Sequence, residues 1–139
     1  MDVDYVAILA AAVGQFAFGA LWYMPLFGKV WGKIHGFDKL SKEKQKEMMS
    51  KMGPMYGLQF VVTVVTAYVL ARAIELLPNY SPYMLAGMLW VGFVVPTQVA
   101  AVIFGGTDEK WMAKKIGVMA FGTLGCLLVA VFILGLFKN

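Results

Sequence analysis

Four long apolar runs constrain the fold of this chain more than any other feature of its sequence. They extend from about Val3 to Tyr23, Met55 to Leu77, Tyr83 to Phe104 and Ile116 to Phe137. A helix of about 20 residues crosses a hydrocarbon core of about 30 Å, so each run is long enough to span a bilayer. Lipid offers no partner for the edge of an open sheet, which favours helices over strands. We therefore expect an all-α integral membrane bundle of four helices.

The composition agrees with lipid as the solvent for most of the chain. Of the 139 residues, 60% are hydrophobic and 14% are charged, whereas soluble domains carry about a quarter charged residues. A soluble domain of this size could not bury so many apolar side chains, because small domains keep a large surface relative to their volume. We assign residues 1–139 to a single membrane domain whose main partner is the lipid bilayer.

Positive charge is concentrated on one side of the predicted spans. Ten of the twelve basic residues lie in the connection 25–53 or after the third span: Lys29, Lys33, Lys39, Lys42, Lys44, Lys46, Lys51, Lys110, Lys114 and Lys115. The positive-inside rule places these two segments in the cytoplasm and both termini outside. Arg72 and Lys138 lie near the outer helix ends, where long side chains reach the interface. We expect a multi-pass protein of the cell (inner) membrane.

The cytoplasmic connection 25–53 is too long for a tight turn. Its first part mixes aromatic residues and lysines, which is typical of an interfacial segment, and its second part is predicted to be a helix capped by Ser41. The lysines either attract anionic lipid or dock a cytoplasmic protein partner, or they only set topology and solubility. We expect no nucleic-acid partner, because no recognisable binding module accompanies the charge.

Polar residues inside the spans form a predicted layer in the cytoplasmic half. One glutamine occurs in each of the first three spans, and helical rise places all three roughly 7 to 11 Å inside the cytoplasmic boundary. The candidate binding residues of this layer are Gln15, Gln59, Thr63, Pro96, Thr97 and Gln98. An unpaired amide is costly in hydrocarbon, so these side chains are expected to face the bundle interior. They are either structural glue between helices or the lining of a small pocket or ion path.

Trp90 and the small residues predict where helices meet. Trp90 lies well inside the third span, where we interpret it as packing between helices, with the lining of a ligand site as the alternative. Small residues four apart, such as Ala10 and Gly14 or Ala113 and Gly117, predict close helix approaches. Four short helices enclose little volume, so we expect some of these faces to serve a homo-oligomer, with a dimer favoured.

Residue patterns for catalysis and cofactor binding do not occur in the sequence. His35 is the only histidine and Cys126 the only cysteine, so we expect neither a metal site nor an intramolecular disulfide. The sequence contains no GxSxG or P-loop motif and no paired carboxylates within a span. We expect no enzymatic activity and no cofactor.

Two motifs carry a family resemblance. The first is the run Gly-x-Leu-Trp-Tyr-x-Pro-x-x-Gly-Lys-x-Trp at residues 19–31, and the second is Trp90-Val91-Gly92-Phe93 followed by Pro96-Thr97. With these motifs, and over nearly its whole length, the chain resembles the domain-of-unknown-function 1761 family of small bacterial and archaeal membrane proteins. The resemblance implies a four-helix membrane protein and brings no assigned substrate, cofactor or catalytic residue.

Two functional hypotheses follow from the sequence. In the first, the protein is a homo-oligomer that binds or conducts a small solute or ion through the polar layer in the cytoplasmic half. In the second, it is a structural or accessory membrane subunit that recruits a partner through its basic cytoplasmic connection. Replacing Gln15, Gln59 and Gln98 singly by leucine distinguishes them, since a pocket loses its function while structural glue does not.

Overall fold

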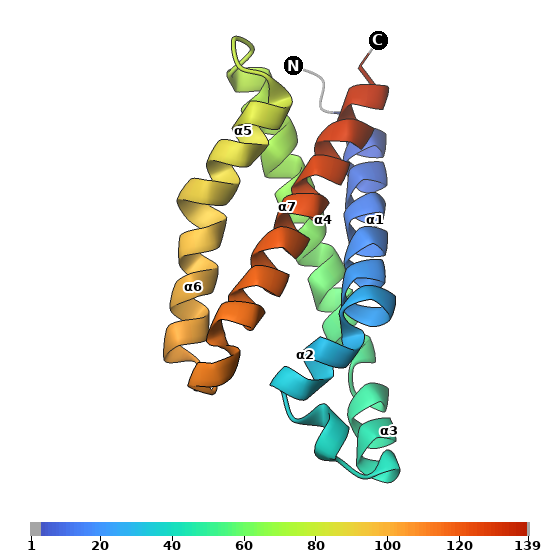
Figure 1. Cartoon of the computed structure of the whole chain (residues 1–139). Helices are drawn as coiled ribbons and strands as arrows, with labels where there is room; N and C mark the ends of the chain where they lie inside the picture. Colours follow the sequence, from blue (N-terminus) through green and yellow to red (C-terminus); the bar gives the residue numbers. More distant parts are fainter. Residues whose placement is uncertain (1–3, 139) are drawn as a thin grey trace.

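The computed structural model describes residues 4–138, and every regular element in that range is helical (Figure 1). Four helices are long and apolar enough to cross a membrane: Tyr5–Leu26, Gly53–Leu76, Pro82–Phe104 and Glu109–Leu136. The prediction of an all-α bundle with four spans is therefore confirmed. Val3, where the first span was predicted to begin, lies outside the described residues.

Only the second span is one uninterrupted α-helix. The first combines α1 (Tyr5–Leu21) with the π-helical turn η1 (Trp22–Leu26), and the second is α4 (Gly53–Leu76). The third is made of α5 (Pro82–Leu89), the π-helical turn η3 (Trp90–Val94) and α6 (Val95–Phe104). The fourth begins with the 3₁₀ turn η4 (Glu109–Trp111) and continues as α7 (Met112–Leu136).

The helices begin where the local sequence favours it. The Asp4 carboxylate accepts a hydrogen bond of 3.0 Å from the Ala7 amide, which caps α1. Pro82 occupies the first turn of α5, where its missing N–H leaves no bond unmade. Asp108 caps η4 by accepting a bond from the Lys110 amide. The fourth helix therefore starts before Ile116, the predicted first residue.

Proline accounts for the two π-helical turns. Pro25 lies inside η1, and Pro96 follows η3 by two residues. Because proline has no N–H, the usual bond to the carbonyl four residues earlier cannot form there. The helix instead forms hydrogen bonds to the carbonyl five residues earlier, which gives a wider turn. At η1 the Phe27 amide donates to Trp22 O at 2.9 Å. The sequence analysis did not predict these turns.

The connection between the first two spans folds as three short helices, α2 (Gly28–Ile34), the 3₁₀ turn η2 (Phe37–Lys39) and α3 (Lys42–Ser50). Ser41 caps α3 by accepting a bond from the Lys44 amide at 3.3 Å, as predicted. Gly36 turns the chain between α2 and η2 with a φ of 71°, a backbone conformation that favours glycine.

Helix α7 is central to the packing. It runs between α1 on one side and the third span on the other, and α1 also packs against α4 (Figure 1). Alanines without exposed surface fill much of the core: Ala11, Ala12, Ala67, Ala86 and Ala130. Such small side chains let helices approach closely, which is how helices associate in lipid.

The small-residue faces join α1 to α7 within the chain. A Cβ at Gly14 would lie 2.2 Å from Ile133 Cδ1, and one at Gly125 would lie 2.3 Å from the Phe18 ring. These glycines are thus already covered by their own chain. The expectation that some small-residue faces serve a homo-oligomer stays a prediction for the remaining faces.

Candidate functional site

The predicted polar layer does not form one cluster. Gln15 on α1 is buried, Gln98 on α6 is half-buried, and Gln59 on α4 is exposed. Among residues 4–138 no hydrogen bond joins any two of the three. The expectation that all three amides face the interior is wrong for Gln59, because that position lies on the outer side of α4. Whether any of them binds a ligand stays a prediction.

Gln15 is the most enclosed of the three glutamines, with 4% of its surface exposed. Its backbone carbonyl accepts a weak bond from Cys126 Sγ at 3.5 Å, which links α1 to α7. Its side-chain Nε2 has no hydrogen-bond partner among the described residues. A buried donor without an acceptor costs stability, so this amide is not structural glue of the predicted kind.

Gln98 belongs instead to a polar seam along α7. Its Nε2 lies 3.4 Å from Met119 O, and its Oε1 accepts from Thr123 Oγ1 at 3.4 Å. The single hydroxyl hydrogen of Thr123 is shared between this contact and Ala120 O of its own helix, which is closer at 2.9 Å. The sequence analysis missed Thr123, although a lone hydroxyl in an apolar span is a signal that could have found it.

Two tryptophans extend this seam from opposite sides of α7. Trp90 Nε1 donates to Ala120 O at 2.7 Å, and Trp22 Nε1 donates to Val118 O at 2.9 Å. Each tryptophan is the first residue of a π-helical turn. A Cβ at Gly122 would lie 2.7 Å from Trp22 Nε1, so glycine makes room for the indole. Trp90 thus packs between helices, and its alternative role in lining a ligand site stays untested.

The two threonines predicted to belong to the layer donate hydrogen bonds only within their own helices. Thr63 is buried and donates to Gln59 O at 2.7 Å, while Thr97 is exposed and donates to Phe93 O at 2.6 Å. Pro96 is exposed on the third span. These residues satisfy their own polar atoms locally, so they add little to a shared site.

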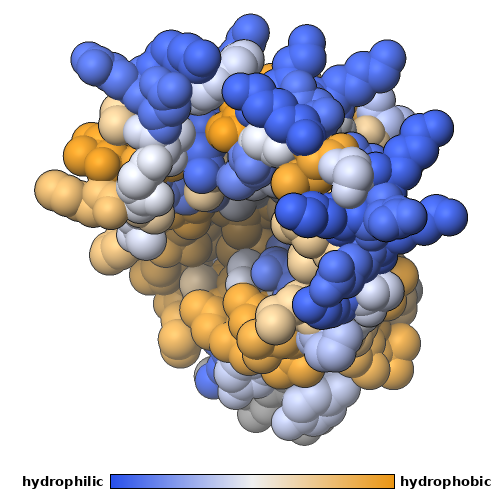
Figure 2. All heavy atoms as spheres, turned by 90° about the horizontal axis from the view of Figure 1, so that it is seen from below, coloured by the Kyte–Doolittle hydropathy of each residue, from blue (hydrophilic) through white to orange (hydrophobic). Residues whose placement is uncertain are grey.

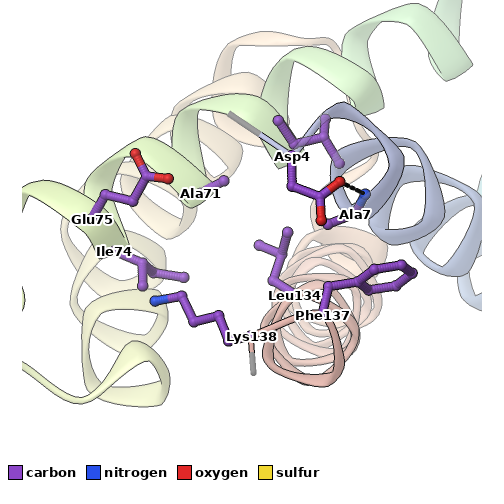
Figure 3. A pocket seen from close by; sticks show the side chains of 9 residues that line it. Asp4, Ala7, Ala71, Ile74, Glu75, Leu134, Phe137 and Lys138 are labelled. Carbon is purple, nitrogen blue, oxygen red and sulfur yellow. Dashed lines mark hydrogen bonds between the residues drawn. The ribbon is translucent and has the colours of Figure 1, made fainter. Parts of the chain in front are cut away.

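A cavity lies at the opposite end of the bundle, between α1, α4 and α7 (Figure 3). It has a volume of about 220 Å³ and is lined by Asp4, Ala7, Ile8, Ala71, Ile74, Glu75, Leu134, Phe137 and Lys138. The Glu75 carboxylate is already paired with Arg72 at 2.6 Å on the same helix. This cavity was not predicted from the sequence, although the charged residues near the ends of three helices, Asp4, Glu75 and Lys138, were a signal for it.

Comparison with known proteins identifies the family. A family model described as a protein of unknown function (DUF1761) matches residues 6–137. The chain belongs to the DUF1761 family. Neither the curated proteins nor the solved structures give a match.

In this DUF1761 protein the two motifs coincide with the π-helical turns. The run 19–31 covers the end of α1, η1 and the first part of α2, and the segment 90–97 covers η3 and the start of α6. Both motifs therefore contain a tryptophan that donates to α7 and a proline that widens the helix. Much of what the motifs encode is the attachment of two spans to α7.

The lysines of the DUF1761 protein gather at one end, formed by residues 27–52 and 105–115 and named here the lysine-rich end. Figure 2 views this end directly and shows hydrophilic side chains spread over it, with apolar side chains between and beside them. Lys115 Nζ lies 5.8 Å from the centre of the Trp31 ring, which joins the start of α7 to α2. Lys110 and Lys114 lie over Trp111 at 5.8 and 5.7 Å.

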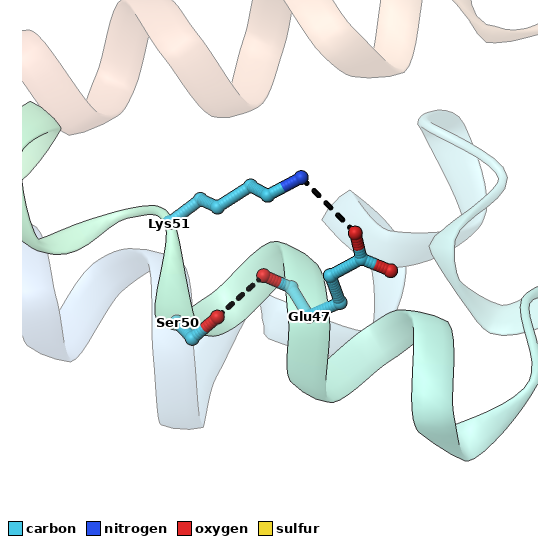
Figure 4. Close-up of polar contacts among 3 residues, drawn as sticks. All are labelled: Glu47, Ser50 and Lys51. Atoms are coloured by element: carbon cyan, nitrogen blue, oxygen red, sulfur yellow. Dashed lines mark hydrogen bonds and ion pairs between the residues drawn. The ribbon is translucent and has the colours of Figure 1, made fainter.

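The ion pairs at this end are exposed. Lys51 Nζ lies 3.1 Å from Glu47 Oε1, and Ser50 Oγ donates to Glu47 O beside it (Figure 4). Both side chains of the Lys51–Glu47 pair are more than 60% exposed, so the pair contributes little to stability. Residues 4–138 contain no group of three or more side chains able to hold a metal ion.

Proposed function

We propose that this DUF1761 protein is a non-enzymatic membrane protein whose lysine-rich end faces the cytoplasm and binds anionic lipid headgroups. The contact between Lys115 and Trp31 carries the proposal. It unites two segments, far apart in the chain, into one basic surface beside the spans. Tryptophans favour the headgroup level of a bilayer, so the adjacent lysines are at the right depth to meet lipid phosphates.

The charge balance of the lysine-rich end supports the same conclusion. It contains ten lysines and five carboxylates, which gives a net charge of +5. Among residues 4–138, ion pairs at this end involve only Lys51 and Lys110. Lysines close to an anionic membrane surface contribute about 1 kcal/mol each to binding. The unpaired lysines together therefore favour anionic over zwitterionic lipid.

The inner glutamine layer receives less support as a solute site. Gln59 lies on an exposed helix face, and the polar atoms of Gln98 already contact α7. We therefore prefer the surface function of the lysine-rich end to conduction through this layer.

Lipid retention tests the proposal. The protein is purified from vesicles of phosphatidylcholine and phosphatidylglycerol in equal amounts, and retained lipids are counted by native mass spectrometry. We expect phosphatidylglycerol to be enriched, and enrichment to fall when Lys114 and Lys115 are both replaced by glutamine. Two lysines at about 1 kcal/mol each predict a loss of affinity of up to about thirtyfold.

A matched pair of changes serves as the control. Lys42→Gln with Lys44→Gln removes the same charge from α3, and among the described residues neither of these lysines lies over a tryptophan ring. We expect this variant to lose less phosphatidylglycerol than the variant at Lys114 and Lys115. Equal retention of both lipids by the unmodified protein would contradict the proposal, and equal losses in the two variants would show that only total charge matters.

A further inference from the structure

One face of α4 is left uncovered along most of the span. Its residues follow one another at intervals of four and three: Met55, Gln59, Val62, Thr66, Val69, Ala73 and Leu76. The large side chains of this seam, named here the α4 seam, are well exposed, with 57% for Met55, 49% for Val62, 55% for Val69 and 62% for Leu76. An average spacing of 3.5 residues is the pattern of two helices that cross at a shallow angle with left-handed twist.

Gln59 places a polar group inside the apolar span, in the cytoplasmic half of this seam. Phe16 lies near the middle of the first span, ten residues before Leu26, which corresponds to about 15 Å of helix. The Phe16 ring contacts the Phe60 ring, with 5.8 Å between their centres. Gln59 itself follows Gly53, the first residue of α4, by six residues or about 9 Å of helix, so its amide lies inside the apolar span, in the cytoplasmic half.

The side chain of Gln59 makes no hydrogen bond to any residue within 4–138. An amide in hydrocarbon is costly unless it is paired. The primary amide both donates and accepts, so it is complementary to a copy of itself. Two copies inserted in the same orientation and related by an axis along the membrane normal would bring their Gln59 side chains to the same depth.

We propose that the protein forms a homodimer in which the α4 seam packs against that of a second copy, with the two Gln59 amides hydrogen-bonded across the axis. Thr66 and Ala73 are small residues one and two heptads after Gln59, so they allow the helices to approach closely. A single polar residue in an otherwise apolar seam fixes the register of such a pair.

Other faces of the molecule fit a second copy less well. The glycines Gly14 and Gly125 are covered inside the chain by Ile133 and Phe18. The third span exposes large apolar side chains such as Phe93 and Phe104, and the nearby Thr97 hydroxyl is bonded to its own helix. Lipid satisfies such a surface, so the unpaired amide of Gln59 distinguishes the α4 seam.

Cysteine cross-linking in phosphatidylcholine vesicles tests the geometry. In a Cys126→Ala background, Val62→Cys and Val69→Cys place thiols on the seam, and Val61→Cys places a comparably exposed thiol about 100° around the helix. We expect copper phenanthroline to cross-link the first two variants and to leave the third mostly monomeric. Cross-linking of Val61→Cys to the same extent, or of none of the three, would overturn the proposal.

The role of Gln59 is tested by dilution of fluorescently labelled protein in the same vesicles. Hydrogen bonds between spans contribute about 0.6 to 2 kcal/mol, so Gln59→Leu should raise the dimer dissociation constant about three- to thirtyfold. Gln59→Asn should retain part of the affinity, and Leu58→Ala is the control beside the seam. Circular dichroism verifies that each variant is folded. An unchanged dissociation constant in Gln59→Leu would contradict the proposed amide pair.

Discussion

Gln15 and Gln98 are both amides within apolar spans, but their polar atoms have different surroundings. The Gln98 side chain contacts Met119 O and Thr123 Oγ1, whereas the buried Nε2 of Gln15 has no partner among the described residues. A buried side-chain amide stabilises the protein only if hydrogen-bond partners lie close to its polar atoms. The two side chains should therefore respond in opposite directions to the same substitution.

We expect Gln15→Leu to leave the free energy of unfolding unchanged or to raise it by about 1 kcal/mol, because an unsatisfied buried donor is removed. Gln98→Leu should lower it by about 0.6 kcal/mol, because contacts between α6 and α7 are lost. Reversible unfolding in mixed micelles, followed by circular dichroism, measures both changes. Destabilisation by Gln15→Leu as large as that by Gln98→Leu would show that the Gln15 amide has a partner.

Gly122 gives a second prediction at the residue scale. A Cβ there would lie 2.7 Å from Trp22 Nε1 and 2.9 Å from Trp22 Cδ1, and the indole is held by its bond to Val118 O. We expect Gly122→Ala to destabilise the protein by about 1 to 3 kcal/mol through overpacking. Gly117→Ala on the same helix meets no atom within 4 Å and should be neutral or stabilising. The same unfolding assay compares them, and equal effects would contradict the contact.

The elements differ in how far their sequence predicts them. The spans followed from apolar length alone, since about 20 such residues have few alternatives to a membrane helix. The α3 cap followed from Ser41, because a hydroxyl at that position satisfies a free amide. Both features depend only on residues that are close together in the chain, so they can be predicted from the sequence without knowing how the helices pack.

The direction in which a side chain faces was harder to predict. Depth along a helix placed the glutamines in one layer, but Gln59 turned out to lie on the exposed side of α4. Which side of a helix is covered depends on where its neighbours pack, and α4 meets α1 through contacts such as Phe16 with Phe60. The π-helical turns η1 and η3 also changed the rotation of the residues that follow Trp22 and Trp90.

The Trp31 side chain links helix α2 both to the first span and to the start of the fourth. The centre of the Trp31 ring lies 4.9 Å from the centre of the Tyr23 ring and 4.4 Å from that of the His35 ring. Lys115 Nζ lies 5.8 Å from the centre of the Trp31 ring. We expect Trp31→Ala to loosen the connection between the first two spans. Trypsin should then cut after Lys33 and Lys39 several times faster, as measured by mass spectrometry of timed digests.

Trp111→Ala is the matched control for this change. The Trp111 ring lies beneath Lys110 and Lys114 rather than against α2. Its removal should leave the cleavage rates after Lys33 and Lys39 unchanged. Equal acceleration in both variants would indicate that any loss of an interfacial tryptophan loosens this end, and that Trp31 has no special part in holding α2.

The whole molecule is electrically asymmetric along its long axis. Ten lysines lie at one end, while Asp4, Glu75, Arg72 and Lys138 lie at the other, where the cavity also opens. Moving ten lysines across a bilayer is far more costly than moving the few charges of the opposite end. We expect this asymmetry to give every copy of the molecule the same orientation in the membrane, which the proposed pairing of α4 seams requires.

Thiol labelling in vesicles of known sidedness tests the orientation. In a Cys126→Ala background, Lys46→Cys marks α3 and Asn79→Cys marks the short connection between α4 and α5. The positive-inside rule predicts that a membrane-impermeant methanethiosulfonate reaches Lys46→Cys only in inside-out vesicles and Asn79→Cys only in right-side-out vesicles. Labelling of each site in both preparations would indicate dual insertion. Such mixed orientations would remove the common depth of the two Gln59 side chains, and the reversed pattern would place the lysine-rich end outside the cell, away from the anionic leaflet it is proposed to bind.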